Sequence, residues 1–315
     1  MFEAIDEATA AATLEAAWDA GIRYFDTAPH YGSGLSEHRL GAALRGRPRD
    51  AFVLSTKVGK MLRPDPDGPP NPPFQQPLPF RMTLDYGYDA AMRSVEDSCH
   101  RLGLARIDIA FVHDLAEDAL GDAWIEHLAT ARHGAFRALS ELREQGVIRA
   151  WGIGVNRIEP CLRALDEADP DLFLLAGRYS LLEQPAAATL FPRCLERGVQ
   201  VVVGGPYNSG LLAGGRNYDY RAAPPELIAR RDRIAVVCNG HGIDVRAAAL
   251  RFCAAHPAVA AVIPGAKHAG KVRENAALMK AVTPAALWDE LKAEQLIPAD
   301  IIVPRDETPA APAVS

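Results

Sequence analysis

The chain carries the stretch Arg23-Tyr-Phe-Asp-Thr-Ala-Pro-His-Tyr-Gly-Ser-Gly-Leu-Ser-Glu37. A short apolar run, Ile22 to Phe25, ends in the carboxylate of Asp26, and a turn at a proline then leads to the phenol of Tyr31. This order is typical of a buried strand that passes into a loop carrying polar groups. We therefore interpret the stretch as a strand end that opens on a functional site.

Two later apolar runs end in a basic side chain. The run Ala51-Phe-Val-Leu-Ser-Thr-Lys57 ends in a lysine, and the run Ile107-Asp-Ile-Ala-Phe-Val-His113 ends in a histidine. In a parallel barrel the carboxyl ends of all strands open on one face, and the active site lies there. The pattern predicts that these two side chains converge with Asp26 and Tyr31.

The four side chains together indicate proton transfer on a carbon–oxygen group. Tyrosine and lysine have ordinary pKa values of about 10 and about 10.4, and a close ammonium favours the phenolate. We expect Lys57 to lower the pKa of Tyr31 and to make the phenol a usable acid or base. Asp26 would keep the lysine charged, and His113 would orient the substrate oxygen through a hydrogen bond.

Short apolar runs alternate with helical segments along the rest of the chain. The further predicted strands are Ile148 to Val155, Leu172 to Leu175, Val199 to Val203 and Val259 to Ile263. Predicted helices include a segment from about Glu7 to Ala20 and another from Ala135 to Glu144. Such alternation predicts a parallel sheet with helices outside it.

These motifs resemble those of the aldo-keto reductase family. The resemblance rests on Phe25-Asp-Thr-Ala-Pro-His-Tyr-Gly32 with Glu37, Leu40 and Gly41, on Ser55-Thr-Lys57 and on Asp108 to His113, and it runs from about Ala12 to Asn275. It implies an α/β fold, the (β/α)8 TIM barrel, with NAD or NADP as cofactor. It also implies a catalytic tetrad, formed by Asp26, Tyr31, Lys57 and His113.

Within the family, two stretches look most like the D-threo-aldose 1-dehydrogenase (L-fucose dehydrogenase) branch, which has pyridoxal 4-dehydrogenase in its neighbourhood. They run from Leu175 to Gln184 and from Gly204 to Leu212. This resemblance implies NAD(P)-dependent oxidation of the anomeric hydroxyl of an aldose, such as L-fucose or D-arabinose, to the lactone. Three alternatives stay open: pyridoxal oxidation, NADPH-dependent carbonyl reduction, and a non-catalytic barrel that senses nucleotide.

The resemblance also implies where the cofactor binds. The candidate contacts are Asn156, then Pro206, Tyr207, Asn208, Ser209, Gly210 and Leu211 around the diphosphate, then Gly265, Lys267, Lys271 and Asn275 around the adenosine phosphate. Gly265 and Ala266 stand where many NADPH-specific members carry Lys and Ser. This departure favours NAD⁺ and leaves NADP⁺ as the alternative.

Composition narrows the class of protein further. A formal charge of −6 and a pI near 5.9 offer no broad basic surface, which argues against binding of nucleic acid or lipid. Five scattered cysteines without a Cys-x-x-Cys pair suit reduced thiols, so we expect no disulfide and no metal. The sequence has no run of apolar residues that could span a membrane. We expect a cytoplasmic enzyme that acts on small molecules as a monomer or homodimer.

The predicted barrel departs from the family pattern at its start. The chain enters a helix near Glu7 without the first strand and Gly-rich segment that family members normally carry, so seven strands are counted. An open barrel wall would leave backbone groups without partners. We hypothesise that Met1 is an internal start and that the natural chain is longer. At 315 residues, one barrel domain over residues 1–305 is the expected organisation.

A long proline-rich insertion covers residues 61–86, and eight of the 24 prolines fall between Arg63 and Pro79. A loop of this length without periodicity is typically a functional lid or a disordered segment, and its place after Lys57 favours a lid. Phe74, Phe80 and Tyr86 would then supply apolar walls for the substrate. Residues 306–315, rich in Ala and Pro, are expected to form a frayed tail.

Overall fold

The computed structural model describes residues 3–68 and 73–305. The chain divides into a first unit, residues 1–174 with 266–273, and a second unit, residues 175–265 with 274–315. The main sheet has seven strands in the order β1-β2-β5-β6-β7-β8-β11. The boundary between the units passes through β7 (Leu172–Ala176). The first half of β7 comes after β6 in the first unit. In the second unit, a hydrogen bond just after the second half of β7 joins the chain to the end of β8.

The first unit holds four neighbouring parallel strands, which are β1 (Tyr24–Asp26), β2 (Val53–Val58), β5 (Ile109–His113) and β6 (Ala150–Val155). Apart from the strand ends and a few flanking positions they are buried, as near-continuous apolar runs require. The register places Asp26 opposite Ser55, and Lys57 opposite Phe111. Parallel strands end at one edge of their sheet, so the polar side chains at the ends of β1, β2 and β5 lie at the same edge.

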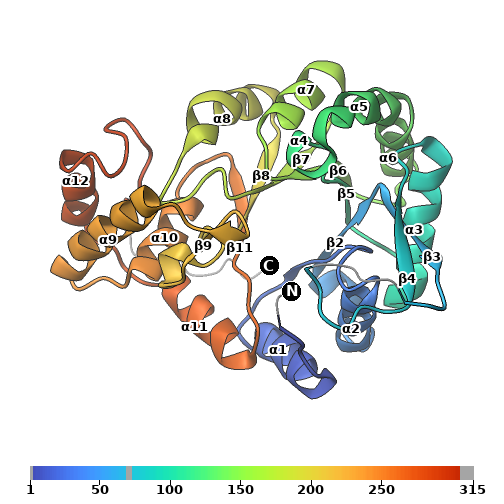
Figure 1. Cartoon of the computed structure of the whole chain (residues 1–315), viewed down its shortest axis with the longest axis horizontal. Coiled ribbons are helices and arrows are strands. Elements are labelled where there is room, and N and C mark those ends of the chain that lie inside the picture. The colour runs from blue at the N-terminus through green and yellow to red at the C-terminus, as the bar shows by residue number, and fades with distance from the viewer. Residues whose placement is uncertain (1–2, 69–72, 306–315) are drawn as a thin grey trace. The chain divides into compact units, whose positions relative to one another are not determined.

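Helices cover the outside of these strands, and α3 lies beside α2 and α6 (Figure 1). The helices of the first unit are α1 (Glu7–Asp19), α2 (Leu35–Leu44), η1 (Arg49–Ala51), α3 (Tyr88–Leu102), α4 (Glu117–Leu120), η2 (Gly121–Ala123), α5 (Trp124–His133), α6 (Ala135–Glu144) and α7 (Glu159–Glu167). In α6 the buried positions recur at helical spacing and include Ala135, Leu139 and Leu142. That spacing forms the apolar stripe by which a surface helix packs on its sheet.

The contact between α2 and α3 explains two residues of the sequence motif. Gly41 lies against the end of α3, where a Cβ would come within 2.0 Å of the Leu102 carbonyl oxygen. Glu37 is buried on the same helix and accepts a hydrogen bond from Thr56 Oγ1 at 2.7 Å. Its other oxygen pairs with Arg101 of α3. The glycine permits the close approach, and the ion pair fixes it.

The second unit pairs β8 (Gln200–Gly204) with β11 (Val259–Ile263) in parallel. Its other elements are α8 (Pro185–Arg197), η3 (Leu211–Ala213), β9 (Asn217–Tyr218), β10 (Arg221–Ala222), α9 (Pro225–Gly240), α10 (Val245–Ala254), α12 (Ala285–Ala293) and all of α11 (Ala269–Met279) beyond Arg273. The buried ring of Tyr179 packs at 4.7 Å from Phe191 and at 5.2 Å from Phe252, between ring centroids. These rings form part of this unit's core.

The seven predicted strands correspond to the seven strands of the sheet, and the predicted helices over Glu7 to Ala20 and Ala135 to Glu144 correspond to α1 and α6. The expectation of an additional first strand in a longer natural chain stays a prediction. The predicted frayed tail, residues 306–315, lies outside the described residues, as do residues 69–72 of the insertion.

The insertion differs from an unpatterned loop. Its arms form β3 (Lys60–Pro64) and β4 (Phe80–Leu84), which pair antiparallel with Lys60 opposite Leu84. Tyr86, expected to face the substrate, is instead buried at the base of this hairpin, where its hydroxyl donates to the carbonyl oxygen of His113 at 2.8 Å. A buried tyrosine hydroxyl needs a hydrogen-bond partner, and for Tyr86 the carbonyl group at the end of β5 is that partner.

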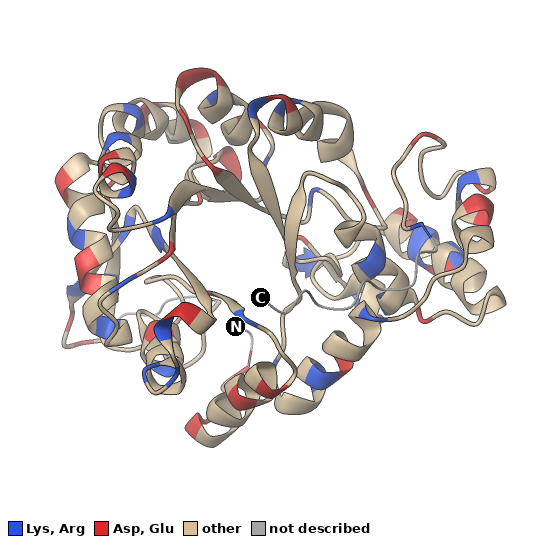
Figure 2. Cartoon of the chain, turned by 180° about the vertical axis from the view of Figure 1, so that it is seen from behind, with Lys and Arg blue, Asp and Glu red and all other residues tan. Residues whose placement is uncertain are grey.

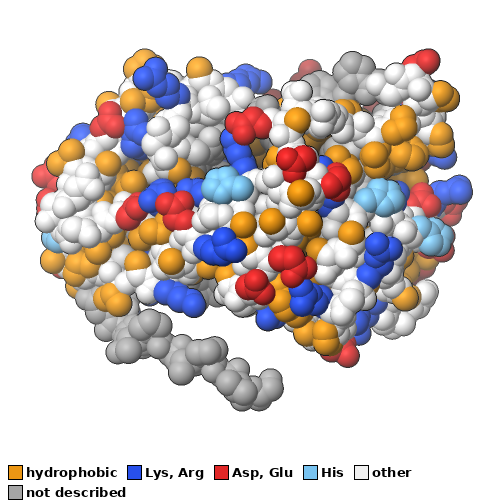
Figure 3. All heavy atoms as spheres, turned by 90° about the horizontal axis from the view of Figure 1, so that it is seen from below, with side chains coloured by type: hydrophobic (Ala, Val, Ile, Leu, Met, Phe, Trp, Pro, Cys, Tyr) orange, Lys and Arg blue, Asp and Glu red, His pale blue; other side chains and the backbone are white. Residues whose placement is uncertain are grey.

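Charged residues of both signs alternate along the outer helices (Figure 2), and hydrophobic, basic and acidic side chains are mixed on the face seen in Figure 3. Among the described residues, no helix combines the length and apolar character needed to cross a membrane.

The close contact at Gly41 generates a stability prediction. Gly41→Ala should lower the free energy of unfolding by about 2 to about 3 kcal/mol, because the new methyl group meets backbone that cannot rotate away. Gly46→Ala is the matched control, since a Cβ at Gly46 meets nothing within 4 Å, and it should change the same quantity by less than about 0.5 kcal/mol. Urea denaturation measures both. Equal effects of the two substitutions would contradict the packing assigned to α2 and α3.

Candidate active site

A buried ion pair joins the ends of β1 and β2. Lys57 Nζ lies 2.6 Å from Asp26 Oδ2 and donates to the carbonyl oxygen of Thr27 at 2.9 Å. The second carboxylate oxygen, Oδ1, accepts a hydrogen bond from Ser55 at 2.6 Å. The side chains of Lys57 and Asp26 are only 2% and 9% exposed. Both charges are therefore held by several partners in a largely dry environment.

Lys57 is an ammonium in this environment. Burial by itself would lower the pKa of Lys57, but the Asp26 carboxylate and the neighbouring Tyr31 hydroxyl outweigh that effect and raise the pKa above its ordinary value. The side chain thus delivers a fixed positive charge to the site at any working pH.

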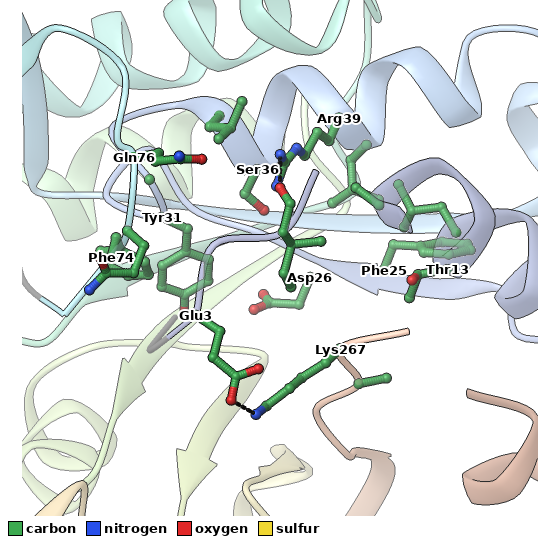
Figure 4. Close-up of a pocket in the computed structure, with 18 residues that line it drawn as sticks. Glu3, Thr13, Phe25, Asp26, Tyr31, Ser36, Arg39, Phe74, Gln76 and Lys267 are labelled. Carbon is green, nitrogen blue, oxygen red and sulfur yellow. Dashed lines mark hydrogen bonds and ion pairs between the residues drawn. The ribbon is translucent and has the colours of Figure 1, made fainter. Parts of the chain in front are cut away.

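Tyr31 lies against this charge. Lys57 Nζ is 4.6 Å from the centroid of the Tyr31 ring, and the ring meets His113 edge to face at 5.6 Å between centroids. Figure 4 shows Tyr31 with Phe74 on one side and Asp26 on the other. The phenol is therefore placed between the ion pair, the imidazole and an apolar ring from the insertion.

The net shift of the Tyr31 pKa is opposite to the one predicted from the sequence. Burial raises the pKa of Tyr31 to about 12, while the positive charge of Lys57 acts in the lowering direction. Asp26 cancels part of the lysine's field because it lies on the same ammonium. Lys57 therefore limits the rise in pKa and does not reverse it.

His113 is a neutral imidazole. It is buried, and burial holds its pKa well below the ordinary value. Its Nε2 lies 3.5 Å from Asp114 Oδ2, and among the described residues its buried Nδ1 has no hydrogen-bond partner. A neutral ring carries one N–H, and the neighbouring carboxylate favours that proton on Nε2. His113 can then donate one hydrogen bond to a substrate oxygen.

A cavity of about 380 Å³ in the first unit reaches Asp26 and Tyr31. Phe74 of the insertion lines it, and its ring lies 5.8 Å from that of Tyr31 between centroids. The insertion is bound to the loop that carries Tyr31, because the Leu78 N–H donates to the Gly32 carbonyl oxygen at 3.0 Å. Of the three rings expected to face substrate, Phe74 lies beside the tetrad, while Phe80 is half-buried in β4.

The predicted cofactor contacts fall in both units. In the first unit, Asn156 donates to Asp118 at 3.3 Å, and Lys267 pairs with Glu3 at 2.6 Å. Lys271 lies in the first turn of α11, where its N–H donates to the carbonyl oxygen of His268 at 3.0 Å.

In the second unit, Tyr207 donates to Asn275 Oδ1 at 3.0 Å, and Asn275 in turn reaches the Gly265 carbonyl oxygen at 3.5 Å. This arrangement brings three of the sequence candidates together. The loop after β8 turns through left-handed backbone at Asn208, Ser209 and Gly210, with φ of 47°, 55° and 93°. Pro206 and Leu211, which flank these residues, are buried.

These residues fit a nucleotide. Asn208 Oδ1 is buried and, within the described part of the chain, has no hydrogen-bond partner, so it can accept from a ligand. The N–H groups of Asn208, Gly210 and Leu211 donate within the loop itself. Side chains of this loop would therefore make contacts to a bound cofactor.

The sequence interpretation missed two charged residues beside the tetrad. Lys60 Nζ lies 2.5 Å from Asp114 Oδ2, and this second ion pair adjoins His113. The available signal was their position in the sequence, because Lys60 lies three residues after Lys57 and Asp114 directly follows His113.

Comparisons with known proteins agree with the sequence motifs. A family model described as "Aldo/keto reductase family" matches residues 2–294. D-threo-aldose 1-dehydrogenase from Pseudomonas sp is 43% identical, over 95% of this chain and 91% of that protein. Pyridoxal 4-dehydrogenase from Microbacterium luteolum is 41% identical, over 94% and 91%.

Solved structures show the same fold. An aldo-keto reductase from Bacillus halodurans in its holo form is 28% identical with a TM-score of 0.71, covering 95% of this chain and 90% of that one. An aldo/keto reductase from Klebsiella pneumoniae in complex with NADP and acetate is 25% identical with a TM-score of 0.65, covering 93% and 87%.

The buried ion pair predicts a large cost for removing one partner. Asp26→Asn should lower the free energy of unfolding by about 3 to about 5 kcal/mol, because it leaves the Lys57 ammonium buried without a counter-charge. Asp50→Asn, which breaks an exposed pair with Arg106, should have little effect. Thermal and urea unfolding of both variants measure the difference. A similar, small effect for both would show that Asp26 and Lys57 are not a buried pair.

Proposed function

The chain belongs to the aldo/keto reductase family, and from that premise we propose that it oxidises the anomeric hydroxyl of an aldose, such as L-fucose or D-arabinose, to the lactone. It is an oxidoreductase, and its cofactor is NAD or NADP. The observation that carries the proposal is the Lys57 ammonium, held by Asp26 and set 4.6 Å from the centroid of the Tyr31 ring.

The relatives support an oxidation of this type. The chain covers 91% of D-threo-aldose 1-dehydrogenase at 43% identity, and the name of that protein specifies oxidation at C1 of a sugar. A cyclic aldose carries a hydroxyl and a hydrogen on C1, and loss of a proton from the former and a hydride from the latter gives a lactone.

Each tetrad residue has a distinct part in the proposed reaction. Tyr31, as the phenolate, takes the proton of the C1 hydroxyl. Lys57 stabilises the phenolate by its charge, and Asp26 holds that charge in place. His113 donates from Nε2 to the substrate oxygen and orients it. The bound nicotinamide supplies the acceptor for the hydride.

We propose that the cofactor is held by Asn156, Pro206, Tyr207, Asn208, Ser209, Gly210, Leu211, Gly265, Lys267, Lys271 and Asn275. NAD⁺ is favoured over NADP⁺ because Gly265 offers no charge for a 2′-phosphate and the Lys267 ammonium is already paired with Glu3. A single lysine at 271 would meet such a phosphate only as a point charge.

Oxidation of pyridoxal is the second candidate. The relative with that activity in its name is 41% identical over most of the chain. The cyclic hemiacetal of pyridoxal presents the same kind of carbon as an aldose, and the Phe74 ring beside Tyr31 suits a flat aromatic substrate. A general carbonyl reductase would use the same four side chains. A barrel that only senses nucleotide would have no use for the buried ion pair beside the phenol.

Other expectations stay predictions. They are one barrel domain over residues 1–305, a lid formed by the insertion, a monomer or homodimer, and a cytoplasmic location.

Replacing Tyr31 by Phe tests the assigned acid–base residue. Tyr31→Phe should reduce kcat for oxidation of L-fucose by roughly 100-fold to 10,000-fold, because the proton acceptor is lost. The dissociation constants of NAD⁺ and NADP⁺, measured by fluorescence titration, should stay unchanged. Tyr88→Phe is the control, because that hydroxyl bonds Glu141 on the helices and should not affect turnover. Full turnover in Tyr31→Phe would overturn the assignment.

The raised pKa of Tyr31 predicts a rising pH profile. Oxidation uses the phenolate, and with a pKa of about 12 its fraction grows as the pH rises. The kcat/KM for oxidation should increase steadily from about pH 7 to about pH 10. The kcat/KM for reduction of an aldehyde substrate, which uses the phenol, should not increase over this range. Initial rates in overlapping buffers give both profiles. An oxidation rate that is flat over this range would show that Tyr31 does not titrate as the base.

A further inference from the structure

The residue after the catalytic histidine has an unusual backbone conformation. Asp114 has φ of +50°, in the left-handed region that non-glycine residues seldom adopt. Its N–H donates to the Gly154 carbonyl oxygen at 2.9 Å, and its own carbonyl accepts from Ala116 at 2.9 Å. These bonds hold the turn, which places the carboxylate next to His113 and Lys60. Strain of this kind persists where surrounding structure enforces it, often at functional sites.

The partner of Asp114 is rigidly held. Lys60 begins β3 directly after Gly59, which has φ of +99°. A Cβ at Gly59 would come within 2.3 Å of the Tyr86 ring, and Tyr86 in turn donates to the His113 carbonyl. The hairpin base, the ion pair and the histidine thus form one packed platform.

The carboxylate is the accessible member of the ion pair. The Lys60 side chain is 8% exposed and that of Asp114 is 25% exposed. Both the contact to Lys60 and the approach to His113 use Oδ2, and among the described residues Oδ1 has no hydrogen-bond partner. Burial would raise the pKa of Asp114, but His113 and Lys60 lower it to about 2, so the group is an anionic acceptor.

The His113 imidazole and the Asp114 carboxylate lie side by side without a hydrogen bond between them. The distance of 3.5 Å from Nε2 to Oδ2 is longer than an N–H···O hydrogen bond. His113 can donate to the reacting oxygen while the adjacent carboxylate accepts from a second hydroxyl. Two hydroxyls on neighbouring carbons have the separation and the donor capacity that this pair of groups requires.

We propose that Asp114 is a specificity-determining residue, which accepts a hydrogen bond from the hydroxyl on the carbon next to the reacting one. Lys60 is a positioning residue that fixes the carboxylate. The inference rests on the proposed function, because in an aldose the neighbouring hydroxyl is the one on C2. The preferred substrates are then sugars with a free C2 hydroxyl, and 2-deoxy sugars are discriminated against.

The test compares D-arabinose with its 2-deoxy analogue as substrates. The kcat/KM ratio of the two sugars is measured for the unaltered chain, for Asp114→Leu, which has a similar size and no acceptor, and for the double variant Lys60→Met with Asp114→Leu. The double variant removes both charges and so avoids an unpaired buried lysine if the single variant folds poorly. Asp50→Asn is the control, because it removes an exposed carboxylate that precedes β2, at the opposite end from Lys57.

The unaltered chain and Asp50→Asn should prefer D-arabinose by about 10-fold to about 100-fold, as expected for a hydrogen bond to a charged group. In both Asp114 variants the ratio should fall to within about threefold of unity, with NAD⁺ affinity unchanged. Slower turnover with an unchanged ratio would overturn the role of Asp114 and leave the proposed function standing. If the unaltered chain oxidises neither of these two sugars and also neither L-fucose nor L-galactose, the proposed function fails, and the inference fails with it.

Discussion

The candidate active site depends on one buried ion pair, Lys57 with Asp26. Taking two charges out of water is costly, and the cost is offset only where each charge has further hydrogen bonds. Thr27 and Ser55 supply those bonds, and the parallel register of β1 with β2 sets Asp26 opposite Ser55. The pairing of two short strands therefore fixes the position of a positive charge. The proposed role of Tyr31 depends on its distance from that charge.

Around that charge the site balances opposing effects on a single phenol. Exclusion of water raises the pKa of Tyr31, and the ammonium counteracts the rise. The same exclusion keeps His113 neutral, so it can donate a hydrogen bond without adding a second positive charge. In the proposed mechanism, a hydroxyl compound would bind with its proton directed at the Tyr31 phenolate and its oxygen at the neutral His113 donor. The proposed oxidation of an alcohol or hemiacetal carbon depends on that pairing.

Local sequence patterns predicted the strands, and they predicted that Asp26, Lys57 and His113 converge, because each lies at the end of an apolar run and parallel strands bring such ends together. The catalytic roles of these residues, and of Tyr31 in the loop after Asp26, stay predictions. The pattern did not predict the hairpin arms β3 and β4, whose pairing joins residues separated by a proline-rich segment. It also missed the contact of Lys60 with Asp114, since this depends on a left-handed turn at an aspartate. The Tyr31 pKa was predicted with the wrong sign, because the extent of burial is a property of the whole fold.

The most direct measurement is the initial rate of NAD⁺ and NADP⁺ reduction with L-fucose, D-arabinose, L-galactose and pyridoxal at mildly alkaline pH. Oxidation of an anomeric hydroxyl predicts reduced nucleotide formed in step with lactone from at least one of the sugars, faster with NAD⁺ than with NADP⁺. Reduction of nucleotide with pyridoxal and with none of the sugars would contradict the aldose assignment and favour pyridoxal oxidation in its place. No reduction with any of the four compounds would contradict the dehydrogenase function itself.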